Sequence, residues 1–148
     1  MASPYKTPVS VLVMIYTTDL QVLLLERADH PGYWQSVTGS QHPGESLLET
    51  VLREVREETG LRAEQYELHD CKQQNSYTIY PEWRHRYAPG VDTNVEHVWR
   101  LKLPEPLPIQ LAQREHLQHA WHPYQEAAKR CFSPSNAAAI LQLTQSAN

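Results

Sequence analysis

The sequence predicts an α/β protein in which a mixed β-sheet lies between helices in an α/β/α sandwich. Two β-rich runs, residues 8–17 and 21–27, come first, and an amphipathic helical pattern between Ser46 and Gly60 follows them. Later strand-like runs and two closing helical patterns complete the order. Strands on both sides of one early helix, with helices at the end of the chain, favour a sheet that is covered on both faces.

The first strands are expected to form a hairpin. Residues 8–17 (PVSVLVMIYT) and 21–27 (QVLLLER) are rich in β-branched and large aliphatic side chains, and the turn residues 18–20 separate them. Residues 34–38 (WQSVT) should form a short strand that leads into a loop at Gly39.

The helix that follows has clear start and stop signals. Ser46 and Glu49 form an S-x-x-E capping box, and Gly60 stands where a left-handed residue ends a helix. At about 100° per residue, its apolar side chains form one stripe. That stripe contains Leu47, Leu48, Val51, Leu52 and Val55.

The second half of the chain alternates strands and loops. Residues 66–80 and 95–103 are predicted strands, separated by the polar, aromatic segment 81–94. The proline-rich residues 103–110 should cross the surface as a loop, and a final strand is expected after Glu115.

Two helices are expected at the end, one after Pro123 and one capped by Ser135 or Asn136. With 148 residues, 41% of them hydrophobic and 20% charged, the chain has the size and composition of one globular domain, residues 1–148. The sequence leaves open whether it is a monomer or a homodimer.

Charge and composition exclude several classes of function. A net charge of −4 and a pI near 6.0 argue against general nucleic-acid binding. No apolar run reaches the roughly 18–20 residues of a membrane span, and residues 1–10 lack the layout of a signal peptide, so we expect no membrane association and a cytoplasmic location. Cys71 and Cys131 are far apart and are expected to be free thiols.

The helix carries a concentration of carboxylates that calls for a metal ion. Glu54, Glu57 and Glu58 lie together on the edge of the apolar stripe, and Glu45 precedes the helix. Arg53 is placed to pair with Glu57, but one guanidinium does not neutralise four carboxylates. Mg²⁺, or Mn²⁺ in its place, prefers carboxylate oxygens and shares its coordination with substrate phosphates. A solvated acidic helix face is the alternative interpretation.

Residues 39–61 also carry a known family motif. Gly39, five residues, Glu45, seven residues, Arg53-Glu54-Val55, one residue, Glu57-Glu58, one residue and Gly60-Leu61 complete the spacing of the Nudix box, so the chain is identified as resembling Nudix hydrolases. Flanking runs resemble the subgroup of this family that hydrolyses dihydroneopterin triphosphate. These runs are YKTPVSVLVMIY, YWQSVTGS, RHRYAPGV, REHLQHAW and SNAAAI.

The resemblance implies a fold, a reaction and a set of functional residues. The fold is the Nudix-type sandwich, and the reaction is metal-dependent hydrolysis of a small triphosphate, 7,8-dihydroneopterin 3′-triphosphate, to the monophosphate and pyrophosphate in folate biosynthesis. The alternatives are a house-cleaning nucleoside triphosphate pyrophosphatase and a non-catalytic nucleotide-binding module. A binding module usually lacks a box glutamate, whereas this chain keeps all of them.

The residue roles implied by the resemblance fall into three groups. The metal ligands are Glu54, Glu57, Glu58 and Glu115. The catalytic group is Arg53, Glu57 and Glu115. The substrate contacts are Lys6, Arg27, Thr38, Tyr77, Thr78, Ile79, Tyr80, Arg86 and Ser133. Which glutamate is the general base stays open.

Histidines and tryptophans offer weaker candidates. His116, His119 and His122 recur every three residues, which would spread them around a helix rather than form a zinc site, so we expect surface histidines. Tryptophans are more often core than ligand platform. Trp83, beside the RHRY run at 84–87, is the one placed to stack on a pterin.

Overall fold

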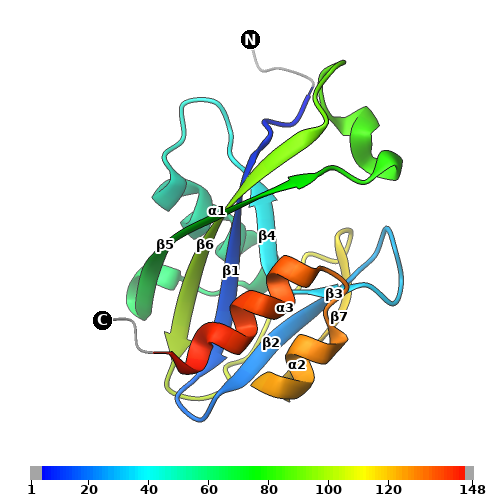
Figure 1. Cartoon of the computed structure of the whole chain (residues 1–148). Coiled ribbons are helices and arrows are strands. Elements are labelled where there is room, and N and C mark those ends of the chain that lie inside the picture. Colours follow the sequence, from blue (N-terminus) through cyan, green and yellow to red (C-terminus); the bar gives the residue numbers. More distant parts are fainter. Residues whose placement is uncertain (1–4, 146–148) are drawn as a thin grey trace.

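The computed structural model describes residues 5–145, so residues 1–4 and 146–148 of the expected domain lie outside it. Among the described residues, a seven-stranded mixed β-sheet forms the centre (Figure 1). Its order is β3-β2-β1-β6-β5, with β4 paired to β1 and β7 paired to β2. The strands are β1 (Val9–Thr17), β2 (Gln21–Arg27), β3 (Trp34–Gln35), β4 (Val37–Ser40), β5 (Glu67–Thr78), β6 (Thr93–Leu103) and β7 (His116–Pro123).

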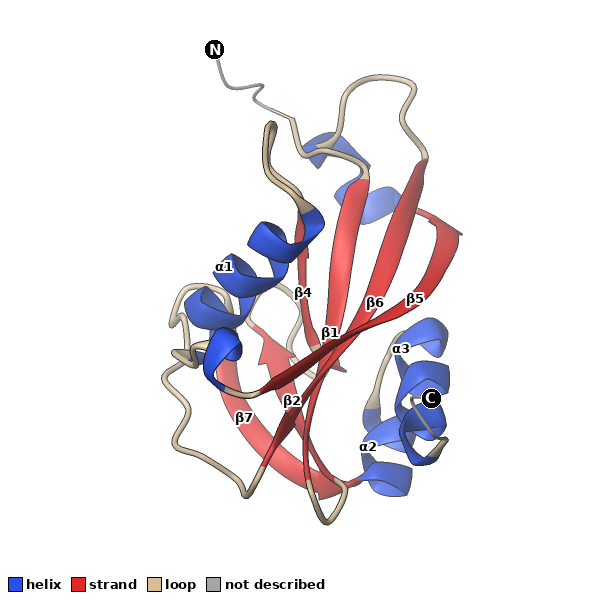
Figure 2. Ribbon diagram, turned by 90° about the vertical axis from the view of Figure 1, so that its left-hand side faces the viewer, coloured by secondary structure: helices blue, strands red, loops and turns tan. Residues whose placement is uncertain are grey.

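Helices cover both faces of this sheet, which confirms the predicted α/β/α sandwich. Figure 2 shows α1 (Leu47–Thr59) on one face and α2 (Tyr124–Arg130) with α3 (Pro134–Leu141) on the other. Short 3-10 helices span Ala63–Gln65, Pro81–Arg86 and Gln142–Thr144. No helix between residues 5 and 145 has the length and apolar character needed to cross a membrane.

The parallel pair β1 and β6 forms the middle of the sheet, and β1 is buried on both faces. Side chains alternate along a strand, so Val11 and Val13 face α1, whereas Leu12 and Met14 face α2 and α3. The almost unbroken apolar run of the first predicted strand reflects this two-sided burial.

Helix α1 begins and ends as its sequence predicts. The Ser46 side chain accepts from the Glu49 amide, the Glu49 side chain accepts from the Ser46 amide, and Gly60 is left-handed with φ 78°. Val51 and Val55 are completely buried on the predicted stripe. Leu48 was wrongly placed in that stripe. It lies in the first turn and is 47% exposed, because the centre of the buried face runs through Val51, Val55 and Glu58.

Several boundaries differ from the sequence prediction. The single strand expected at residues 34–38 is divided into β3 and β4, because the first pairs with β2 and the second with β1. Gly39 lies inside β4, paired with Val11, rather than in a loop, because the glycine leaves room for a side chain from α1. The cap of α3 is Ser133 rather than Ser135 or Asn136, since its hydroxyl accepts from the Asn136 amide and Pro134 occupies the first helical position.

Candidate active site

One cavity of about 1360 Å³ gathers residues from both faces and from the loops around β4. Every site residue named from the sequence lines it. These are Lys6, Arg27, Thr38, Arg53, Glu54, Glu57, Glu58, Tyr77, Thr78, Ile79, Tyr80, Arg86, Glu115 and Ser133. Residues up to 127 positions apart therefore share one space, although the sequence places them in separate motifs.

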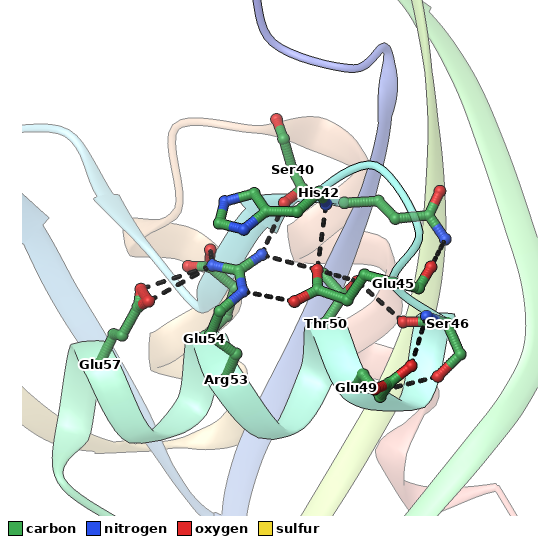
Figure 3. A network of polar contacts seen from close by, with 10 residues as sticks. Ser40, His42, Glu45, Ser46, Glu49, Thr50, Arg53, Glu54 and Glu57 are labelled. Atoms are coloured by element: carbon green, nitrogen blue, oxygen red, sulfur yellow. Dashed lines mark hydrogen bonds and ion pairs between the residues drawn. The ribbon is translucent and has the colours of Figure 1, made fainter. Parts of the chain in front are cut away.

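Arg53, in the middle of α1, is the centre of a polar network that joins this helix to the segment before it (Figure 3). Its guanidinium donates to both carboxylate oxygens of Glu45 at 2.7 and 2.9 Å, and to the Ser40 carbonyl at 2.9 Å. It also donates to Glu54 at 2.5 Å and, more weakly, to Glu57 at 3.4 Å. The expected Arg53–Glu57 pair is confirmed, but Glu45 is the stronger partner. The Arg53 hydrogen bonds lower the pKa of Glu45 to about 2.

Gly39 allows the carboxyl group of Glu54 to lie directly against strand β4. A Cβ atom built on Gly39 would lie 2.0 Å from the Glu54 carboxyl carbon and 2.3 and 2.4 Å from its oxygens. No side chain fits in that space unless the carboxyl group moves. The glycine is thus required for close approach and not for a left-handed turn.

Glu58 is a nearly buried carboxyl group without a full set of partners. It is 1% exposed, and its Oε1 has no hydrogen-bond partner among residues 5–145. Burial, reinforced by the carboxylate of Glu54 and then that of Glu115, raises the pKa of Glu58. His116 Nε2 lies 3.6 Å away, but burial lowers the pKa of His116 to about 4, so this contact is not a charged pair near neutral pH.

Glu115 approaches these carboxylates from the loop before β7. Its carbonyl accepts from the Ala28 amide at 2.9 Å, which fixes the loop beside β2. Loss of solvation raises the pKa of Glu115, and the nearby carboxylates of Glu54 and Glu57 raise it further. Two segments far apart in the sequence, α1 and the loop before β7, thus bring their negative charge to one end of the cavity.

Cations gather beside the carboxylates. Arg27 binds Asp29 through two hydrogen bonds of 2.7 Å, and Arg86 reaches the same carboxylate at 2.9 Å. These two guanidinium groups hold the pKa of Asp29 well below its usual range. Desolvation lowers the pKa of Lys6, and the charges of Arg86 and Arg27 lower it further. With Asp29 as the one acid beside these three cations, this part of the cavity has a net positive charge, which suits an anionic ligand.

Aromatic rings form another wall. The Arg27 guanidinium lies 4.4 Å from the ring centroid of Trp83, and Trp83 packs edge-on against Tyr80 at 5.4 Å. Phe132 lies 6.2 Å from both rings. The other three tryptophans contribute to the core, as expected. These are Trp34, Trp99 and Trp121.

The sequence matches the model of a known family. A family model described as a NUDIX domain matches residues 6–143. The chain belongs to the Nudix family. Nudix hydrolases generally need a divalent metal ion and act on small phosphate compounds, which agrees with the carboxylates and cations that line the cavity.

Two curated Nudix relatives and one solved structure are similar over nearly the whole chain. Dihydroneopterin triphosphate diphosphatase of Escherichia coli K12 is 45% identical over 141 residues, covering 93% of each chain. The Haemophilus influenzae protein of the same name is 39% identical over 139 residues, covering 92% of this chain and 87% of the relative. The structure of the E. coli dihydroneopterin triphosphate pyrophosphohydrolase superposes with a TM-score of 0.89 at 44% identity, covering 95% of this chain and 97% of that one.

The histidine prediction was partly wrong. His116 is buried, because it begins β7 and points into the Glu58 side of the cavity, whereas His119 is exposed and His122 is half-buried. These histidines lie on strand β7, so the argument from helical spacing does not apply to them. Cys71 and Cys131 are both free, as expected.

Sequence reasoning missed several polar residues that line the cavity. They include Ser10, Asp29, Gln35, Asn94 and Glu96. Asp29 holds the two arginines, and Glu96 is a carboxylate only 5% exposed. The sequence does carry a signal for Glu96. Alternation along β6 buries positions 94, 96 and 98, and a charged residue at such a core position is unusual.

Proposed function

We propose that this chain is a metal-dependent Nudix pyrophosphohydrolase that converts 7,8-dihydroneopterin 3′-triphosphate to dihydroneopterin monophosphate and pyrophosphate in folate biosynthesis. The observation that carries this proposal is the 45% identity, over 93% of both chains, to the E. coli diphosphatase named for this substrate. The cavity agrees with it, because carboxylates, cations and aromatic rings line one space.

The carboxylate end fits a divalent cation. Among residues 5–145 no three acidic or histidine side chains are already arranged around a shared ion position. Glu58 nevertheless has a buried, unpartnered oxygen and a raised pKa, which a neighbouring positive charge would correct. We assign Glu54 and Glu58 as the main ligands, with Glu57 and Glu115 beside them. Held by these residues, Mg²⁺ or Mn²⁺ would supply positive charge that stabilises the phosphate oxygens and would lower the pKa of a nearby water.

The protein's own groups position the reaction. Glu57 and Glu115 are the two carboxylates suited to accept the proton of the attacking water, and the raised pKa of Glu115 favours such a role. Arg53 serves as a positioning residue, because it binds Glu45, Glu54 and Glu57. Its contacts hold the carboxylates of α1 in place rather than the substrate.

The substrate end combines charge with flat surfaces. Lys6, Arg27 and Arg86 are placed to neutralise the triphosphate, and Asp29 keeps the two arginines oriented. Trp83 and Tyr80 offer aromatic surfaces for a bicyclic ring.

Product analysis tests the proposal. The purified protein with Mg²⁺ should release pyrophosphate and dihydroneopterin monophosphate in equal amounts, and a chelator should abolish turnover until Mg²⁺ or Mn²⁺ is restored. Release of orthophosphate, or turnover that survives the chelator, would be incompatible with this reaction. Binding of the triphosphate without any cleavage would favour the non-catalytic module instead.

A further inference from the structure

Strand β6 carries a carboxylate where its alternation predicts a core residue. Asn94, Glu96 and Val98 project from one face of the sheet, because side chains alternate along a strand. Val98 packs into the core beneath α2 and α3. Glu96 is only 5% exposed and Asn94 is completely buried. Burial of such groups costs free energy of solvation, so their presence here needs another reason.

The existing partners of Glu96 leave it able to accept further hydrogen bonds. Its carboxylate accepts from the Ser135 hydroxyl at 3.0 Å and from the Asn75 side chain. An ionised carboxylate offers about four acceptor positions. Burial raises the pKa of Glu96, and a ligand that donates two N–H groups would stabilise its charged form.

The side chain of Asn94 donates hydrogen bonds, but its oxygen accepts none from the described residues. Its Nδ2 donates to the Ser10 hydroxyl at 2.7 Å and to the Tyr77 hydroxyl at 3.1 Å. In this arrangement both hydroxyls serve as acceptors. Its buried Oδ1 has no partner in the described part of the chain. An acceptor of this kind is costly unless a ligand fills it.

Glu96 and Asn94 line the same cavity as the carboxylates of α1. Glu96 pairs with Ser10 on β1, and Ser10 pairs with Ser40 on β4, the strand that carries Gly39 against Glu54. Two strand spacings separate Ser40 from Glu96, about 10 Å. Glu96 and Glu54 both line the cavity of about 1360 Å³, so one ligand can contact both ends.

We propose, resting on the proposed hydrolase function, that Glu96 and Asn94 form a subsite for the 2-amino-4-oxopyrimidine edge of the substrate. The Glu96 carboxylate accepts from the ring N–H and from the adjacent exocyclic amino group. Asn94 Oδ1 accepts a remaining N–H. Pterin and guanine both present this edge, whereas adenine does not.

A structural role is the competing explanation. Glu96 contacts Ser135 in the first turn of α3, so it also contributes negative charge beside that helix end. A purely structural carboxylate would affect stability and would weaken all ligands alike. A carboxylate that recognises the ligand should instead discriminate between ligands. If a carbonyl replaces the amino group, its oxygen faces the carboxylate oxygen and no hydrogen bond can form.

Ligand binding to the wild-type protein gives the first test. Calorimetry should show that neopterin binds at least about tenfold more tightly than its 2,4-dioxo analogue, which lacks the amino group. Guanosine, measured in parallel, shows whether the edge is read in guanine as well as in pterin. Equal affinity for neopterin and the dioxo analogue would overturn the subsite, whatever the protein hydrolyses.

Variants give the second test. Glu96→Gln should abolish the preference for neopterin over the dioxo analogue and lower kcat/KM for the pterin triphosphate at least about tenfold more than for dATP. Ser135→Ala should weaken neopterin binding far less, and Glu126→Gln, an exposed change on α2, serves as the matched control. Equal losses for both substrates, or equal effects of Glu96→Gln and Ser135→Ala, would assign Glu96 a structural role.

The two proposals fail separately. If the wild type discriminates neopterin from its dioxo analogue but does not cleave dihydroneopterin triphosphate, the subsite stands and the proposed reaction falls. If it cleaves the triphosphate without discriminating the analogues, the reaction stands and the subsite falls.

Discussion

Replacing Gly39 with alanine would place a methyl group where the Glu54 carboxyl group lies. The new Cβ would be 2.0 Å from the carboxyl carbon, whereas ordinary contact begins at 3.4 Å, so the carboxyl group must withdraw by about 1.4 Å. A misplacement of about 1 Å in a catalytic site costs on the order of 100-fold. We therefore expect kcat to fall about 100-fold, equivalent to about 2.7 kcal/mol.

The fold should survive this change. The group that moves is the end of a flexible side chain, and glycine is unfavourable within a strand, so the free energy of unfolding should change by less than about 1 kcal/mol. Steady-state kinetics and urea unfolding measure the two effects separately.

A double-mutant cycle identifies the route of the effect. In a Glu54→Gln background, Gly39→Ala should lower kcat by less than about threefold, because the carboxylate that it displaces is already gone. The same 100-fold loss in both backgrounds would refute the reasoning, since Gly39 would then act independently of Glu54.

Four further substitutions test the carboxylates on and around α1. Glu54→Gln or Glu58→Gln should lower kcat by roughly two to four orders of magnitude at saturating Mg²⁺ with little loss of stability; near wild-type kinetics in both variants would contradict their assignment as ligands. Glu115→Gln should lower kcat by about 100-fold or more, and an unchanged rate and pH–rate profile would reject its role. Because Arg53 lowers the pKa of Glu45 from 4.5 to about 2, ionised Glu45 stabilises the fold above pH 4.5 and loses this effect as the pH falls toward 2. Glu45→Gln should therefore destabilise by about 1–2 kcal/mol near pH 7, after allowance for solvent screening, with the difference from wild type closing near pH 2 in urea titrations.

The sequence predicts local structure well where the signal itself is local. The capping box of Ser46 and Glu49, the Gly60 stop and the apolar run of β1 each depend on neighbouring residues, and each is present. The predictions that are wrong concern features that depend on tertiary packing. Leu48 belongs to the apolar stripe by angle, yet its exposure depends on where the sheet covers the helix.

In the candidate site, too, local spacing predicts some contacts, whereas others depend on tertiary packing. The motif places Glu54 and Glu58 one helical turn apart on a helix, so their proximity follows from the spacing. The hydrogen bond between Ser135 on α3 and Glu96 on β6 could not be predicted from sequence spacing. Strand pairing and the packing of α3 on the sheet bring these two residues together. Buried polar positions of this kind become visible only when the alternation of a strand is compared with its packing.

Substrate preference tests the central claim most directly. Initial rates on dihydroneopterin triphosphate and on each common nucleoside triphosphate, at matched Mg²⁺ and with products identified, give kcat/KM for every candidate. The account predicts a value at least about tenfold higher for the pterin, equivalent to roughly 1.4 kcal/mol of transition-state binding. Equal or better cleavage of dATP, or of any other nucleotide, would contradict it and would make this chain a nucleoside triphosphate pyrophosphatase.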